Sequence, residues 1–168
     1  YPDINYPLPT TFSFSQLRAF QTCLYQYKLA YLLQIPAKQS HYFSFGTSMH
    51  VTLQRFYERI EAMNGAVQGS FFSPVVQTSR LVSTTTAPAL DELLKLYDEN
   101  WIADWYESKN QREAYYKKGK EILRAFYQKH EGKWTVPVAL EKGFKMKVGE
   151  YLVTGKLDRV DQLADGAL

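Results

Sequence analysis

The apolar residues of this chain change their spacing once, at about residue 130, and this change decides the fold class. Before that point they recur every three to four residues, as on one face of an α-helix. Over Val138–Val148 they alternate with charged residues, which is the pattern of a half-buried β-strand. A second strand is expected over Tyr151–Leu163, after a hairpin turn at Gly149-Glu150. The spacing predicts an α/β fold in which helices are followed by antiparallel strands.

The apolar stripes predict four helices. Three of them run from about Ser13 to Pro36, from Leu90 to Trp105 and from Gln111 to Lys129, and the second along the chain begins at about Gly46. Ser13 and Gln16 have the spacing of a capping box, so the first helix should begin there. The second helix should have Thr47 or Ser48 as its cap, which places His50 in its first turn.

The chain has the length of a single domain, with one long segment that has no periodic pattern. From Asn64 to Pro88 it is rich in Gly, Ser, Thr and Val, and a surface loop or insertion is expected there. Asp165-Gly166 is a strong hairpin signal, but only Ala167 and Leu168 follow it. We therefore expect residues 1–168 to be the N-terminal part of one domain, with a sheet that is incomplete at its C-terminal end.

Several classes of protein and site are excluded by what the sequence lacks. It has no apolar run of the roughly 18 residues that a membrane-spanning helix needs. Its single cysteine, Cys23, cannot form an internal disulfide or a zinc site alone, and we expect a cytoplasmic protein. The sequence also has no glycine-rich phosphate loop, no Cys-x-x-Cys and no His-Glu-x-x-His motif.

Charge is distributed unevenly along the chain. From Lys109 to Lys147 there are eleven Lys and Arg residues and four Glu residues, a net charge of +7. Because the whole chain carries +3, the remainder carries −4. A basic half suggests a surface for a polyanion, although a solvated helix and strand would have the same composition.

Three residues remain as candidate ligands: His50 near a helix start, Glu141 on the first strand and Asp158 on the second. Carboxylate oxygens and an imidazole nitrogen suit a hard divalent cation that keeps several waters, and such a cation polarises a phosphodiester. Each residue also has an ordinary structural explanation. His50 lies beside an apolar stripe, Asp158 could pair with Arg159, and Asp161 is expected to pair locally or cap the turn.

Three motifs together identify a family. They are Ser13-Phe14-Ser15-Gln16-Leu17 running to Cys23, Gly46-Thr47-Ser48-Met49-His50, and Thr154-Gly155-Lys156-Leu157-Asp158-Arg159-Val160-Asp161. In order and spacing they resemble the RecB-type nucleases of the PD-(D/E)xK superfamily, as found at the C-terminus of UvrD-like helicases and in AddAB-type enzymes. The resemblance implies a restriction-endonuclease-like core, represented here by its N-terminal helices and the first antiparallel strands of its sheet.

The resemblance also implies a metal-dependent DNA nuclease in which His50 and Asp158 bind Mg²⁺ or Mn²⁺. Asp158 is then the first catalytic carboxylate, His50 is the ligand carried by a helix, and Glu141 matches an acidic catalytic position on the preceding strand. The next strand of the family reads Asp/Glu-x-Lys and would follow Leu168. We therefore expect that residues 1–168 alone do not cleave DNA.

The implied setting is a helicase–nuclease with exonuclease activity in DNA repair or recombination. Its partners would be DNA, single-stranded or at a duplex end, and an attached helicase domain or partner subunit. Lys117, Lys118, Lys120 and Arg124 are expected to follow phosphates while Tyr or Trp side chains stack on bases. Some relatives use a cysteine at the place of Cys23 as one of four iron–sulfur ligands; otherwise Cys23 is a small buried side chain.

Two other interpretations stay open. Some relatives have lost their active residues and serve as non-catalytic modules that bind DNA or hold a partner subunit. The Asp/Glu-x-Lys strand would distinguish such a module from a nuclease. A helical interaction domain that binds no nucleic acid is the other alternative, and it predicts no salt-sensitive DNA binding.

Overall fold

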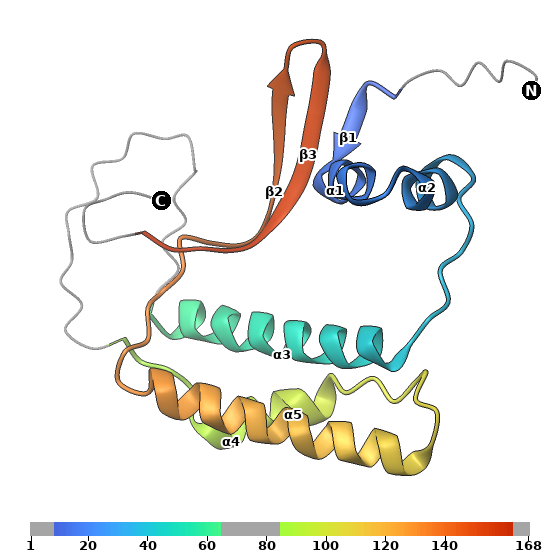
Figure 1. The fold of residues 1–168 in the computed structure, drawn as a ribbon. Helices are drawn as coiled ribbons and strands as arrows, with labels where there is room; N and C mark the ends of the chain where they lie inside the picture. Colours follow the sequence, from blue (N-terminus) through green and yellow to red (C-terminus); the bar gives the residue numbers. More distant parts are fainter. Residues whose placement is uncertain (1–8, 65–84, 163–168) are drawn as a thin grey trace, which may run out of the picture. The chain divides into compact units, whose positions relative to one another are not determined.

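The computed structural model describes residues 9–64 and 85–162, which form helices and a mixed three-stranded sheet (Figure 1). The expected α/β class is confirmed. The chain divides into two compact units, and each unit is built from two stretches of sequence. One comprises Tyr1–Lys38 and Glu141–Leu157, and the other comprises Gln39–Leu140 and Asp158–Leu168.

The larger unit is helical. Its helices α3 (His41–Asn64), α4 (Leu90–Glu99) and α5 (Lys109–His130) lie against one another (Figure 1). The core consists of Phe56, Tyr57, Ile60, Leu93, Leu96, Tyr97, Leu123 and Trp134. The apolar stripes predicted for these helices therefore supply most of the core. On α5, Leu123 occupies the core position of its turn, and the adjacent Ile122 is 41% exposed.

The helix α3 begins at His41, so the predicted caps at Thr47 and Ser48 are wrong. Ser48 Oγ donates to the Ser44 carbonyl oxygen at 2.8 Å, and Thr52 Oγ1 donates to the Ser48 carbonyl oxygen at 2.7 Å. Such bonds to the preceding turn are made by hydroxyls inside a helix. Ser48 Oγ also accepts from the Ile102 N–H at 2.9 Å. These small, buried side chains let the segment after α4 pack closely against α3.

The end of α4 also differs from the prediction. The helix ends at Glu99, whereas Trp101 and Trp105 were expected to extend its stripe. Asn100 Nδ2 donates to the Leu96 carbonyl oxygen at 2.6 Å, which satisfies a carbonyl of the last turn. Trp105 has a φ of +64°, a left-handed conformation that ends any helix. By contrast, α5 lies close to its predicted bounds.

The smaller unit opens with β1 (Thr11–Ser13) and α1 (Phe14–Thr22). The predicted capping box is confirmed, since Ser13 Oγ accepts from the Gln16 N–H at 3.2 Å and Gln16 Oε1 accepts from the Ser13 N–H at 2.7 Å. The single helix expected here is interrupted at Cys23, whose backbone is extended with a φ of −163°. It continues as α2 (Leu24–Tyr27) and a π-helical turn, η1 (Lys28–Leu32).

The strands β2 (Ala139–Val148) and β3 (Tyr151–Val160) form the predicted hairpin. Its turn contains Gly149 with a φ of +60°, a conformation that glycine adopts without strain. β3 is the central strand, and β1 pairs with it in parallel. In β3, the ring of Phe144 on β2 occupies the space that a Cβ atom at Gly155 would need.

Some predictions concern residues outside the described ranges. Asp165-Gly166, Leu163 and most of the segment between Asn64 and Pro88 belong to this group. Among the described residues, no helix has both the length and the apolar character required to cross a membrane.

Candidate metal centre

The structure brings the three candidate ligands together. His50, Glu141 and Asp158 each offer one ligand atom, and these atoms lie within 4.8 Å of one another. His50 and Asp158 belong to the same compact unit. Glu141 lies in β2, which is the neighbour of β3, the strand that carries Asp158.

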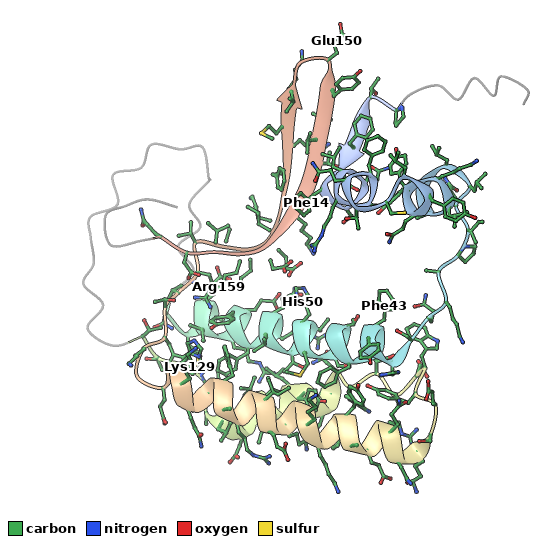
Figure 2. The ribbon with its side chains drawn as sticks, viewed as in Figure 1. Phe14, Phe43, His50, Lys129, Glu150 and Arg159 are labelled. Carbon is green, nitrogen blue, oxygen red and sulfur yellow. The ribbon has the colours of Figure 1, made fainter. Side chains whose placement is uncertain are left out.

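His50 is held by the interior of a long helix. It is the tenth residue of α3, and its side chain is exposed (Figure 2). The expected position in the first turn is therefore wrong, because α3 begins at His41. Ser48 and Thr52, close to His50 in sequence, are fully buried on another face of the helix. A ligand carried by a packed helix is positioned more accurately than one carried by a loop.

Asp158 lies near the end of β3, next to a strongly anchored arginine. The Arg159 guanidinium donates to both carboxylate oxygens of Asp161 at 2.6 Å and lies 3.9 Å from the centroid of the Tyr57 ring. Burial acts to lower the pKa of Arg159, but the hydrogen bonds and negative charge of Asp161 outweigh it and raise this pKa. Arg159 therefore pairs with Asp161 rather than with Asp158, and the local pairing expected for Asp161 is confirmed.

The contact of Arg159 with Tyr57 links the chain segments that carry His50 and Asp158, the two candidate ligands in the larger unit. Tyr57 lies seven residues after His50 on α3, which is two turns along the same helix. Because Arg159 follows Asp158 directly, its contact with Tyr57 fixes the end of β3 on the helix that carries His50. Val138 N–H also donates to the Val160 carbonyl oxygen at 2.8 Å, which holds the strand ends together.

Glu141 has an unusual backbone and a charged partner. Its φ is +50°, a left-handed conformation that is unfavourable for a residue with a Cβ atom. Its side chain is only 13% exposed and forms an ion pair with Lys156. Lys156 and Asp158 are two residues apart in β3, so their side chains leave the strand on the same side. The carboxylate of Glu141 is thereby held at the face of the hairpin that carries Asp158.

The donor set fits a hard divalent cation. Mg²⁺ binds oxygen ligands at about 2.1 Å, so ligands on opposite sides of the ion are about 4 Å apart. The 4.8 Å limit for the three ligand atoms is compatible with one shared ion after small side-chain rotations. Two carboxylates and one imidazole leave coordination positions for water and substrate, as Mg²⁺ requires.

The four basic residues predicted to follow phosphates differ in their surroundings. Lys117 and Arg124 are exposed and seven residues apart on α5, so they share one face of the helix. Lys118 Nζ lies 5.8 Å from the centroid of the Tyr115 ring. Lys120 forms an ion pair with Asp98 at 2.8 Å, and this bond raises the pKa of Lys120. Three of the four cations are therefore better placed than Lys120 to contact a phosphate.

Cys23, the possible iron–sulfur ligand, lies between α1 and α2. Its side chain is exposed, so the alternative of a small buried residue is wrong. An exposed thiol at this position is accessible to a cluster, but a cluster needs four such ligands. Its role in a cluster stays a prediction.

Two contributors to the site were not singled out from the sequence. Lys156 pairs with Glu141, and Tyr57 supports Arg159. The spacing of Lys156 and Asp158 in a strand was a usable signal, because residues two apart share a side. No comparable signal existed for Tyr57, which had the pattern of an ordinary core residue.

Comparison with known proteins identifies the family of this chain. The chain matches the PD-(D/E)XK nuclease superfamily over residues 11–168. No curated protein and no solved structure gave a significant match. The helices and the mixed sheet of the described residues are consistent with a restriction-endonuclease-like fold. The match covers His50, Glu141 and Asp158 and nearly the whole chain, and the chain belongs to the PD-(D/E)XK nuclease superfamily.

Proposed function

We propose that this protein is a metal-dependent DNA nuclease, an exonuclease of the RecB type that belongs to a helicase–nuclease in DNA repair or recombination. The observation that carries the proposal is the meeting of His50, Glu141 and Asp158 within 4.8 Å in a chain of a nuclease superfamily. The RecB type and the attached helicase rest on the motif that ends in His50 and on the motif around Asp158.

In this proposal His50 and Asp158 hold Mg²⁺ or Mn²⁺, with Glu141 as the third ligand. The bound cation supplies Lewis acidity to the scissile phosphate and lowers the pKa of the attacking water. Lys156 keeps the Glu141 carboxylate in place through their ion pair. Arg159 keeps the end of β3 on α3, so that Asp158 and His50 stay in mutual reach.

The proposed substrate is DNA, either single-stranded or at a duplex end. α5 carries seven Lys and Arg residues and two Glu residues, a net charge of +5. Lys117, Lys118 and Arg124 are exposed on this helix and would contact phosphates. We place this activity in the cytoplasm, because the one cysteine of the chain leaves no internal disulfide.

The proposal is tested by DNA cleavage with the full-length protein in Mg²⁺, with Asp158→Asn as the test variant. We expect a loss of at least about a hundredfold in the cleavage rate, because even indirect partners of a metal contribute tenfold to a hundredfold. Glu150→Gln is the matched control, since Glu150 lies at the hairpin turn (Figure 2). Salt-sensitive DNA binding without cleavage by the parent protein would instead indicate a non-catalytic module.

A further inference from the structure

One face of α3 carries both the candidate ligand His50 and an exposed phenylalanine. Phe43 and His50 are seven residues apart, so their side chains leave the helix in nearly the same direction. Both residues are labelled on α3 in Figure 2. Gly46 and Thr47 lie between them, and both are exposed. We call this face the α3 track and define it by Phe43, Gly46, Thr47 and His50.

The chemistry of the α3 track changes along its length. Phe43 is 57% exposed, and its ring offers only an apolar π-face. At Gly46 an added Cβ atom would meet nothing within 4 Å, so the helix surface is open there. At the other end, His50 lies with Asp158 among the candidate metal ligands. The track therefore joins an aromatic surface, an open helix surface and the candidate metal centre.

The spacing fits a short stretch of nucleic acid. Seven helical residues span about 10 Å along the axis, at 1.5 Å per residue. That distance corresponds to about three nucleotides at the 3.4 Å spacing of stacked bases. A base on Phe43 would therefore belong to a nucleotide about three positions from the phosphate at His50.

We propose that the α3 track binds single-stranded DNA, with a base stacked on Phe43 and the backbone passing over Gly46 to the phosphate at His50 and Asp158. The inference rests on the proposed function, because it assigns the substrate strand to the same metal centre. A single strand is favoured over a duplex because a base inside a duplex has both faces covered by its neighbours. Stacking on an aromatic side chain is tolerant of sequence, as an exonuclease requires.

The test measures binding of a fluorescent single-stranded oligonucleotide to the full-length protein in EDTA, where cleavage cannot occur. Phe43→Ala should weaken binding by about tenfold, the effect expected for one stacked base, and Phe43→Trp should restore it. Gly46→Leu should also weaken binding, because its side chain would project into the open part of the track. Met63→Ala is the matched control, since Met63 is 51% exposed at the other end of α3.

The possible outcomes separate this inference from the proposed function. Unchanged binding by Phe43→Ala, or equal competition by duplex of the same sequence, overturns the single-strand track. Failure of the parent protein to bind single-stranded DNA overturns it as well. In each of these cases Mn²⁺ binding by the parent protein is measured separately. Retained Mn²⁺ binding would show that the metal centre stands although the single-strand track does not. Circular dichroism of each variant verifies that the fold is intact.

Discussion

At the scale of single residues, the backbone of Glu141 distinguishes the candidate centre from the rest of the hairpin. Its φ of +50° places a side chain with a Cβ atom in a region that costs about 1–2 kcal/mol. Strained residues of this kind cluster at functional sites, where the surrounding structure holds them in place. Here the ion pair with Lys156 and the pairing of β2 with β3 provide that support.

The strain at Glu141 predicts an unequal effect of two truncations. Glu141→Gly and Glu141→Ala both remove the carboxylate and its pairing with Lys156. Glycine adopts a positive φ without strain, so Glu141→Gly should be more stable than Glu141→Ala by about 1 kcal/mol. The free energy of unfolding in urea measures the difference. Equal stability of the two variants would show that Glu141 is not strained in solution.

At the scale of the helices, α4 and α5 are in contact through Tyr97 and Gly119. Tyr97 is fully buried, and burial, the largest cause, raises the pKa of its hydroxyl. A Cβ atom at Gly119 would overlap the hydroxyl end of the Tyr97 ring. Gly119 therefore permits a close approach of the two helices that no larger residue allows.

This contact predicts opposite effects of the same substitution in two helices. Gly119→Ala should lower the free energy of unfolding by about 1–3 kcal/mol, the usual effect of overpacking a core. Gly46→Ala on α3 meets no atom within 4 Å and should instead raise it by about 0.5–1 kcal/mol, because alanine favours a helix. Thermal unfolding compares the two variants. A stabilising Gly119→Ala would contradict the described packing of Tyr97.

The basic surface of α5 gives a further prediction at this scale. The double variant Lys117→Glu with Arg124→Glu should weaken DNA binding and reduce its dependence on salt, because fewer counterions are released. Lys120→Glu should have a smaller effect per residue, since Lys120 already pairs with Asp98. Titrations at several salt concentrations measure both. An unchanged salt dependence in the double variant would mean that this face of α5 does not contact phosphates.

Helix and strand types were predictable because their apolar spacing is regular, whereas contacts between residues far apart in the sequence were not. The capping box at Ser13 was predicted correctly, since both of its side chains are close in sequence. The sequence predicts a cap at Thr47 or Ser48, because a hydroxyl serves either at a helix start or inside a helix. The partner of Ser48, the Ile102 N–H, is 54 residues away and cannot be inferred from local sequence.

At the scale of the whole molecule, each unit is assembled from distant parts of the chain. In the smaller unit β1 pairs with β3, so that Phe12 lies opposite Val153. In the larger unit Arg159 contacts Tyr57 on α3. Pairings of this kind form only after long loops have closed. The meeting of His50 with Asp158 was foreseen from the family resemblance, whereas spacing alone gave no reason to place them together.

The central claim is that His50, Glu141 and Asp158 together hold a divalent cation. Calorimetric titration of the full-length protein with Mn²⁺ tests it directly, because binding is measured without cleavage. Asp158→Asn should weaken Mn²⁺ binding by at least about tenfold, the lower limit for disturbing a metal site. Glu150→Gln, which alters the hairpin turn instead, should bind as the parent does. Equal Mn²⁺ affinity of Asp158→Asn and the parent would contradict the assignment of this metal centre.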